Sequence, residues 1–262
     1  MKFYFSFMLL PFLFSVVQAK QQVLKFGVTP AYDIPFLFVD KNTGVMTGIA
    51  IDIVEHIAKG MDAKAAVINL PRGRIEPALA DGTIDLICYS NPGWTKQPEL
   101  YKWSDPILEL SDHVIRYKKA APIKTLDDLK GQSVGMVGTY FYEKIMPLVK
   151  NKTIERSDFF DGNGIFKRLQ MGQIYYGILN SYFLQYQQVE LTKYVPSYLP
   201  SPKANANQTS AEPQVFDTGV IDSHYKIYCR AHKKNKIGMD KVNKALIGFK
   251  RKTYSIKDKL EQ

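Results

Sequence analysis

The stretch AAVINLPRGRIEPALADGTIDLICY, residues 65–89, decides the fold. Residues 65–70 are mostly apolar, which favours a strand, and a short segment that begins at Arg74 and ends near Gly82 is predicted to be a helix. Residues 84–89 are a second apolar run, typical of a largely buried strand. A strand, a helix and a second strand in this order indicate a mainly parallel sheet with helices on its faces.

The same alternation continues on both sides of this stretch. Further strands are predicted at 23–28, 133–137, 177–179 and 225–229, and further helices at 49–61, 165–171 and 239–249. Residues 125–128 have the pattern of a capping box, and residues 200–213 have the composition of a loop. Two similar α/β units and a late return strand predict two lobes joined by crossing segments.

In open α/β sheets, ligands bind beyond the carboxyl ends of the strands. The loops that meet this condition follow Val28, Leu70, Tyr89, Val137 and Leu179. We therefore expect the functional site to be assembled from these loops.

The N-terminus has the layout of a secretory signal peptide. Residues 1–2 are a short basic start, residues 3–17 are almost wholly apolar, and Val17 and Ala19 are small residues ahead of a cut before Lys20. We expect cleavage after Ala19 and a periplasmic mature chain that does not insert into the membrane. An uncleaved anchor is the alternative, although the apolar run is shorter than the roughly 20 residues of a spanning helix.

The chain is basic, with 35 Lys and Arg residues, 25 Asp and Glu residues and a formal net charge of +10. A basic surface is typical of proteins that bind nucleic acid, anionic lipid or an anionic ligand. Much of the excess lies at 232–236 and 249–252, two runs that we interpret as solvated helix faces. Nucleic acid is therefore not an expected partner.

The two cysteines, Cys88 and Cys229, do not lie in a metal-binding spacing. His224 and His232 stand near Cys229, but the alternation of a strand directs Cys229 away from both histidines. We expect neither a metal nor a cofactor. In an exported chain, the oxidising compartment permits a disulfide.

Six short motifs occur in order along the chain. They are Pro35-Phe36, Gly48-Ile49-Ala50-Ile51-Asp52-Ile53, Pro77-Ala78-Leu79, Gly82-x-Ile84-Asp85-Leu86, Trp103-Ser104-Asp105-Pro106 and Leu126-Asp127-Asp128-Leu129-Lys130-Gly131. Over residues 23–255 this series resembles the family 3 extracellular solute-binding proteins, the receptors of polar amino-acid ABC importers.

The resemblance implies an α/β, two-lobed fold of the type II periplasmic binding-protein kind, in which each lobe is a mainly parallel sheet flanked by helices. It also implies a cleft between the lobes that closes on the ligand like a hinge. The corresponding segments are a signal peptide at 1–19, the first lobe at 20–113, the second lobe at 114–216 and a return to the first lobe at 217–262.

Departures from the family pattern are informative. Receptors for free amino acids usually hold the α-carboxylate with an Arg and hydroxyl groups, and the ammonium with an Asp. By position, this chain has Gln97 for the Arg, Pro92 for a hydroxyl residue and Asn180 for the Asp, whereas Thr139 is kept after Gly138. A charge-assisted hydrogen bond contributes about 1.5–3 kcal/mol, so an amino acid in the usual pose is not expected.

Other residues are candidates for an altered clamp. Arg74 falls on the Arg of a Pro-aromatic-x-Arg pattern found in a less characterised branch of the family, with Arg72 in place of the aromatic residue. Because the planar Arg fork suits carboxylate or phosphate, we expect a small, polar, anionic ligand. The alternative is that Arg74 pairs with Asp33 or another acid. Trp94 is a candidate for stacking on the ligand or, alternatively, for hinge packing.

The complete set of expected ligand-binding residues is Tyr32, Arg74, Tyr89, Ser90, Asn91, Trp94, Gly138, Thr139, Tyr140 and Asn180. Gly138 and Thr139 are expected at a helix N-terminus, whose backbone amides bind anions. Four aromatic residues near Asn180 are interpreted mainly as core: Tyr175, Tyr176, Tyr182 and Phe183.

The resemblance also places the strand at 225–229 beside the strand at 84–89. Cys88 and Cys229 are then neighbours, either as a disulfide that pins the return strand or as paired buried thiols.

Three functions follow from these observations. The first is a monomeric, non-catalytic periplasmic receptor that presents its ligand to an ABC importer. The second is a ligand sensor for a signalling partner. The third is an enzyme on the same fold, such as a periplasmic dehydratase. Ser111-Asp112-His113 has the residue types of a catalytic triad, but we expect adjacent residues on a strand not to converge.

Overall fold

A computed structural model describes residues 21–138, 140–187, 189 and 213–249. The predicted signal peptide, Thr139 and nearly all of the predicted loop at 200–213 lie outside these residues. The strands are β1 (Gln22–Val28), β2 (Phe38–Val39), β3 (Met46–Thr47), β4 (Ala63–Asn69), β5 (Leu86–Ser90), β6 (Tyr101–Trp103), β7 (Leu108–Tyr117), β8 (Ser133–Val137), β9 (Glu155–Phe159), β10 (Tyr176–Asn180) and β11 (Val215–His232). The α-helices are α1 (Ile49–Gly60), α2 (Ile75–Asp81), α3 (Met146–Lys150), α4 (Gly162–Gln170), α5 (Ser181–Tyr186) and α6 (Met239–Leu246).

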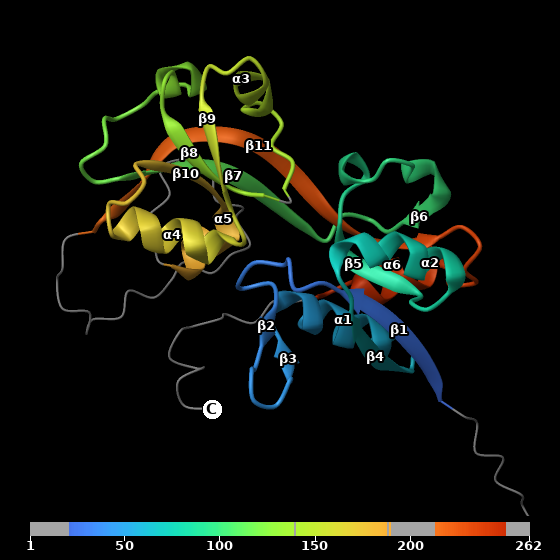
Figure 1. Cartoon of the computed structure of the whole chain (residues 1–262). Coiled ribbons are helices and arrows are strands. Elements are labelled where there is room, and N and C mark those ends of the chain that lie inside the picture. The colour runs from blue at the N-terminus through green and yellow to red at the C-terminus, as the bar shows by residue number, and fades with distance from the viewer. Residues whose placement is uncertain (1–20, 139, 188, 190–212, 250–262) are drawn as a thin grey trace, which may run out of the picture.

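The molecule has two α/β lobes (Figure 1). In the first lobe β1 pairs in parallel with β4 and β5, and β11 lies antiparallel beside β5. In the second lobe β8 pairs in parallel with β9 and β10, and β7 lies antiparallel beside β10. The strand–helix–strand segment at 65–89 is thus β4, α2 and β5, with the two strands on either side of β1. The predicted parallel arrangement is confirmed.

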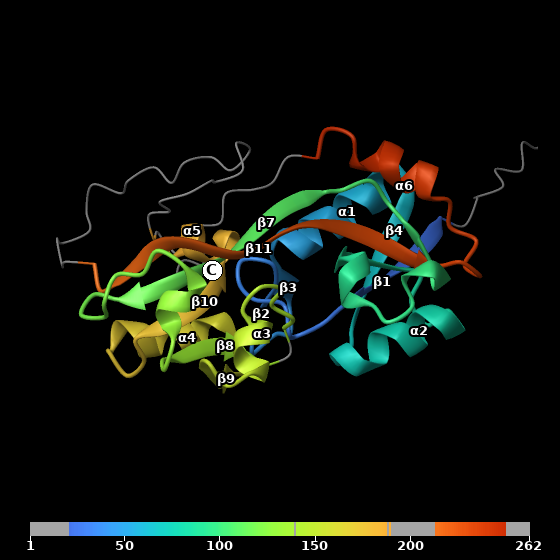
Figure 2. The same cartoon turned by 90° about the horizontal axis from the view of Figure 1, so that it is seen from above.

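Two long strands connect the lobes. β7 and β11 pair with each other from Leu108 opposite Ile227 to Tyr117 opposite Val215. Both views show this pair side by side, running from one lobe to the other (Figures 1 and 2). At about 3.3 Å per residue, β11 is about 60 Å long. The return strand predicted at 225–229 is therefore only one end of a strand that also belongs to the second lobe.

Each lobe has its own hydrophobic core. In the first lobe α1 buries one face, which includes Ile53 and Ile57, against the sheet. Its other neighbour is α6, which approaches closely because Gly60 has no side chain: a Cβ atom there would lie 2.7 Å from the Cβ of Ala245. Two further clusters fill the second lobe on either side of its sheet. Burial of these apolar surfaces is the main stabilising contribution to both lobes.

The β5–β11 pairing sets Cys88 opposite Cys229, and the two residues form a disulfide. This is the first of the two arrangements expected for the cysteines, and it ties the return strand to the first lobe. In the described part of the chain, no group of His, Cys, Asp and Glu is suited to hold a metal ion. None of the described helices has the length and apolar character needed to cross a membrane.

One predicted helix start is wrong. We expected a helix to begin at Gly138-Thr139, but the described residues from Tyr140 form a loop and a turn, and α3 begins only at Met146. Pro147 lies in the first turn of α3, where the missing N–H costs no helical hydrogen bond. The capping box at residues 125–128 is present, and it opens a 3-10 helix at Leu126–Leu129.

Candidate functional site

Three adjoining hollows lie where the loops of both lobes meet β7 and β11. The inner cavity has a volume of about 30 Å³ and is lined by Ala31, Tyr32, Arg72, Tyr89, Trp94, Asp112, Tyr140, Phe141 and Tyr225. The arginine hollow, of about 460 Å³, adds Arg230 and Ser90 to residues shared with the inner cavity. The outer hollow, of about 710 Å³, includes Asn91, Glu109 and His224. Trp94 lines all three, so the hollows adjoin one another at this residue, and together they are called the cleft.

The loop after β5 is held in place by Asn91. Its side-chain oxygen accepts a hydrogen bond of 2.8 Å from the Gly93 N–H, which caps the 3-10 helix Pro92–Trp94. Its side-chain nitrogen donates to the Lys226 carbonyl of β11, also at 2.8 Å. These two bonds fix Trp94 at the junction of the hollows, where a flat apolar face is available to a ligand.

Aromatic rings form the wall of the inner cavity. Tyr32 lies 4.7 Å from Tyr89 between ring centroids, and Trp94 lies 6.0 Å from Tyr89 and 5.3 Å from Tyr225. Burial raises the pKa of the Tyr32, Tyr89, Tyr140 and Tyr225 hydroxyls above the usual value, so all four are protonated at neutral pH. The Tyr32 Oη atom is buried and has no hydrogen-bond partner among the described residues.

Asp112 of β7 is the carboxylate of the inner cavity. One oxygen accepts from the Ser223 hydroxyl at 2.9 Å, and the other accepts from the Tyr225 hydroxyl at 3.1 Å. The side chain is buried, and this burial is the main cause that raises its pKa to about 7. No Lys, Arg or His forms an ion pair with Asp112 among the residues that the structure describes.

Two hydrogen bonds join the lobes beside the cleft. The Tyr140 hydroxyl of the second lobe donates to the Ala31 carbonyl of the first at 2.9 Å. The Gly162 N–H at the start of α4 donates to the Asp33 carboxylate, also at 2.9 Å. Burial raises the pKa of Asp33 to about 6. The loop after β1 therefore contacts both lobes at the side of the cleft.

The structure brings Arg72, not Arg74, to the cleft. Both side chains are exposed, but Arg72 lines the inner cavity and the arginine hollow, whereas Arg74 lines none of the three hollows. Both belong to the 3-10 helix Arg72–Arg74, in which residues two apart point in different directions. Neither forms an ion pair with Asp33 within the described residues.

Arg230, at the far end of the arginine hollow, was not among the expected residues. Its guanidinium group lies 4.3 Å from the centre of the Tyr101 ring and 3.3 Å from a carboxylate oxygen of Glu76. The side chain is nearly buried, and its Nε atom has no hydrogen-bond partner among the described residues. A positively charged group thus stands at this end of the cleft.

The remaining predicted residues divide into two groups. Tyr32, Tyr89, Ser90, Asn91, Trp94 and Tyr140 all line the cleft. Gly138 and Asn180 line none of the three hollows, and Thr139 is outside the described residues. Asn180 is buried and caps α5, because its side-chain oxygen accepts the Phe183 N–H at 2.9 Å. Gln97, in the position of the family's Arg, is exposed and also away from the cleft.

The backbone amides that precede α3 bond to a carboxylate of the chain itself. Asp222 of β11 accepts the N–H groups of Glu143, Lys144 and Ile145 at 2.9, 3.1 and 2.7 Å. This cluster of donors precedes α3 and ties the second lobe to the crossing strand. A ligand anion at these amides would have to displace Asp222.

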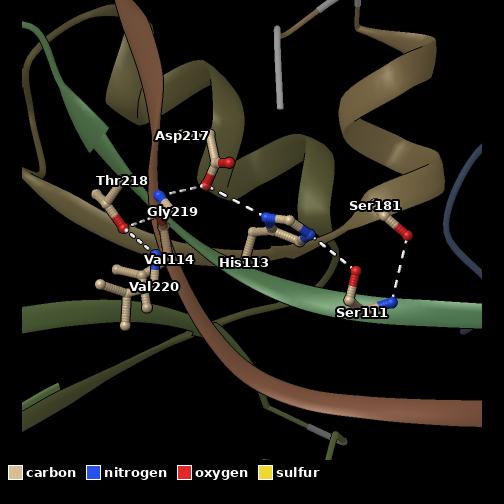
Figure 3. A network of polar contacts seen from close by, with 8 residues as sticks. All are labelled: Ser111, His113, Val114, Ser181, Asp217, Thr218, Gly219 and Val220. Carbon is tan, nitrogen blue, oxygen red and sulfur yellow. Dashed lines mark hydrogen bonds and ion pairs between the residues drawn. The ribbon is translucent and has the colours of Figure 1, made fainter. Parts of the chain in front are cut away.

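Two residues of Ser111-Asp112-His113 do converge, contrary to our expectation, because residues two apart on a strand share a face. Figure 3 shows His113 between Ser111 and Asp217 of β11, with Ser111 Oγ 2.8 Å from His113 Nε2 and Asp217 Oδ1 3.2 Å from His113 Nδ1. The carboxylate comes from Asp217, since Asp112 points to the opposite face. Ser111 and His113 are buried and line none of the three hollows.

Sequence reasoning missed Asp112, Tyr225 and Phe141 as residues of the cleft. Asp112 carries the clearest signal, because it is a charged residue inside the otherwise buried strand β7. Buried charges are costly unless they are paired, so such a position is a functional candidate. Tyr225 and Phe141 carry no comparable signal, since aromatic residues are common in cores.

Comparisons with known proteins show which family this chain belongs to. The family profile of the bacterial extracellular solute-binding proteins, family 3, matches residues 24–259. A probable histidine-binding protein of Campylobacter jejuni is 25% identical over 132 residues, which is 50% of each chain. The probable amino-acid-binding protein YxeM of Bacillus subtilis is 26% identical over 153 residues, 58% of this chain and 57% of the relative. The matched part spans only about half the length of these relatives.

A solved structure shows the same fold. An ancestral arginine-binding protein bound to glutamine superposes with a TM-score of 0.60 at 24% identity, covering 87% of this chain and 92% of the other. The two-lobed architecture, the cleft beside the crossing strands and the match over residues 24–259 agree. The chain therefore belongs to the bacterial extracellular solute-binding proteins, family 3.

Proposed function

We propose that the protein is a periplasmic receptor that captures a small polar ligand between its lobes and presents it to an ABC importer. The observation that carries the proposal is the cleft itself, in which loops of both lobes and both crossing strands meet at Trp94. The buried Tyr32 hydroxyl, which has no partner among the described residues, supports it further. A buried polar group of this kind is costly unless a ligand or water satisfies it.

We propose that the ligand carries an anionic group held in the arginine hollow. Arg72 lines this hollow and forms neither an ion pair nor a side-chain hydrogen bond with the described residues. Arg230 lines the same hollow, but Glu76 also lines it and forms an ion pair with Arg230, so Arg72 is the unpaired cation there among the described residues. The names of the relatives refer to histidine, arginine and amino acids in general. An amino acid or a similar compound fits both observations. Its pose would differ from the usual one, because Gln97 and Asn180 stand here in place of the usual Arg and Asp.

Binding without catalysis is the proposed mode of action. Ser111, His113 and Asp217 are sealed between β7 and β11, so their geometry gives a ligand in the cleft no access to the serine hydroxyl. Their arrangement is better explained as a connection between the two crossing strands near the point where the lobes meet.

We also propose that the chain is exported with cleavage after Ala19 and acts as a monomer. The lobe boundaries in this proposal are 113/114 and 216/217, within β7 and at the start of β11. Boundaries inside paired strands permit a bending motion, because both strands change direction together. Tyr140 and Phe141 line the same cavity as Tyr32 in this structure, and hinge opening would move them away from it.

A thermal-shift screen of the protein against amino acids, organic acids, phosphorylated compounds and short peptides tests the proposal. A ligand at about 100 times its Kd stabilises the folded state by about 2.7 kcal/mol, which raises Tm by roughly 5–10 °C for a chain of this size. If no compound in the screen raises Tm, the proposed receptor function is contradicted.

Two neighbouring arginines provide a matched pair of variants. Arg72→Ala should weaken binding of the identified ligand by about tenfold or more, because it removes a charge-assisted hydrogen bond. Arg74→Ala, two residues away on the exposed side, should change the Kd by less than about threefold. The reverse result would support the residue expected from the sequence and contradict the placement in the structure.

A further inference from the structure

We propose that the inner cavity is a subsite for a primary ammonium group of the ligand, with Asp112 as its counter-ion and tyrosine rings as its walls. This inference rests on the proposed receptor function and extends it. It assigns the ammonium group to the crossing strand β7, an element different from the one that carries Asn180.

The charge of the cavity is the first argument. Asp112 is bonded by two neutral hydroxyls, from Ser223 and Tyr225, and by no cation among the described residues. Buried carboxylates are normally paired with a cation or bound to a metal, because removing the charge from water is costly. Arg72 lines the same cavity but forms no ion pair with Asp112 among the described residues, so this carboxylate can accept a cationic ligand group as its partner.

The walls of the cavity are the second argument. Tyr32, Tyr89, Trp94, Tyr140 and Tyr225 surround the space in front of Asp112. The negative faces of aromatic rings attract a cation within about 6 Å. The free Tyr32 Oη also provides an oxygen that accepts a hydrogen bond from an N–H group. The aromatic rings, the Asp112 carboxylate and the Tyr32 hydroxyl oxygen are therefore all suited to bind an ammonium group.

The size of the inner cavity limits which ligand group can enter it. Its volume of about 30 Å³ is far below the volumes of the two neighbouring hollows, about 460 and 710 Å³, so it favours a small group. A primary ammonium group is smaller than a trimethylated nitrogen and is therefore the better fit. The rest of the ligand must extend past Trp94 into the arginine hollow, which shares Tyr32, Arg72 and Tyr89 with the inner cavity. The ligand class is thus a compound with a primary ammonium group at one end and an anionic group at the other.

The protonation state of Asp112 links binding to pH. Burial raises its pKa to about 7, and an ammonium group in the cavity would favour the ionised form. Several other titratable or charged groups face Asp112 from the elements packed around it: Asp33, Arg72, Tyr89, Tyr140, Tyr142, Asp222 and Tyr225. The tyrosines stay protonated at neutral pH. Asp33, whose pKa is about 6, also titrates between pH 5.5 and 8, so the contribution of Asp112 is measured as the difference between the wild type and Asp112→Asn.

The experiment uses three classes of probe on the full chain, with Tm and then Kd as readouts at pH 8. The first class is L-amino acids, including arginine, histidine and glutamine. The second is nitrogen-free anions, namely succinate, glutarate, citrate and phosphate. The third is betaine and choline, whose nitrogen is trimethylated. Asp112→Asn removes the charge but keeps oxygen and size, and Asp105→Asn, which is exposed and outside the three hollows, is the control.

The expected result is binding of a compound with a primary ammonium group and an affinity at least tenfold lower in Asp112→Asn. The wild-type affinity should also rise by about thirtyfold from pH 5.5 to pH 8 as Asp112 ionises. Asp112→Asn should lose most of this dependence, and Asp105→Asn should retain it.

Three other outcomes are decisive. If nitrogen-free anions bind as well as amino acids, and Asp112→Asn binds them equally, the receptor function stands and the ammonium subsite is wrong. Preference for betaine or choline over every primary amine would also overturn the subsite. If none of the three classes binds, the receptor function is contradicted together with the inference drawn from it.

Discussion

Strand β7 carries buried polar side chains on both faces, and the two faces use them differently. On one face Ser111 and His113 form a chain of hydrogen bonds with Asp217 of β11 (Figure 3). On the other face Asp112, the residue between them, points into the inner cavity and contacts only neutral hydroxyls in the described part of the molecule. Alternation along a single strand therefore separates a sealed network from an open site.

The difference shows how structural and functional polar groups can be told apart. In the sealed network each polar side chain has a partner within the chain, and Gly219 adds its N–H to the Asp217 carboxylate at 3.1 Å. In the cleft, Asp112 has no cation and Tyr32 Oη has no partner among the described residues. A group that the fold satisfies stabilises the fold, whereas a group left open is available to a ligand.

The largest expected effect comes from breaking the sealed network. Asp217→Ala should lower the free energy of unfolding by about 3 kcal/mol, because it removes a buried carboxylate and leaves His113 Nδ1 and the Gly219 N–H without that acceptor. Urea denaturation measures this loss. Ser111→Ala, which removes one neutral hydroxyl from the same network, should cost only about 1 kcal/mol. Equal and negligible losses in both variants would show that the network does not stabilise the hinge.

On the open face, ionisation of Asp112 should lower the stability of the ligand-free protein as the pH rises. The pKa of Asp112 is about 7 in the folded state, above the ordinary value of 3.8 for an aspartate side chain. A raised carboxyl pKa means that the folded state favours the protonated form, so stability is greatest at low pH and is lost as pH rises through 7. Between pH 5 and pH 7 the ligand-free protein should lose about 2 kcal/mol from this group.

Asp33 and Asp222 also have raised pKa values, so the contribution of Asp112 is measured as a difference between two proteins. The free energy of unfolding of Asp112→Asn should change less between pH 5 and pH 7 than that of the wild type. An identical pH profile in the two proteins would show that burial does not raise the pKa of Asp112.

A smaller effect is expected from removing one open hydroxyl. Tyr32→Phe should change the free energy of unfolding by less than about 0.5 kcal/mol, since the hydroxyl has no partner among the described residues. It should weaken ligand binding by about three- to tenfold. Tyr142→Phe is the matched control, because its hydroxyl accepts the Val137 N–H at 2.9 Å. This control should lose about 1–2 kcal/mol of stability, and a reversed pattern would contradict the distinction between open and satisfied groups.

The fold could be predicted well from the sequence, for reasons visible in particular segments. The apolar runs at 65–70 and 84–89 and the helical spacing of Ile49, Ile53 and Ile57 specify buried strands and an amphipathic helix. The length of β11 could not be predicted, because its polar residues Asp217, Asp222 and Ser223 have hydrogen-bond partners far away in the sequence. Local patterns contain no information about such partners.

The cleft was predicted in part. Residues that follow Val28, Leu70, Tyr89 and Val137 meet there as expected, but the described residues directly after Leu179 do not. Of the expected residues, Tyr32, Tyr89, Ser90, Asn91, Trp94 and Tyr140 line it. The roles of Arg72 and Arg74 depend on the direction of a 3-10 turn, which spacing alone does not give. Asn180 became a helix cap and Asp222 took the amides before α3. Both are contacts that form only when the whole lobe is assembled.

The most direct test of the account compares the two faces of β7 in one measurement. The shift of Tm caused by L-amino acids at pH 8 is recorded for the wild type, Asp112→Asn and Ser111→Ala. We expect a ligand to raise Tm in the wild type and, from a slightly lower starting value, by the same amount in Ser111→Ala, whereas Asp112→Asn loses most of the shift. Loss of the shift in Ser111→Ala together with its retention in Asp112→Asn would contradict the assignment of the two faces.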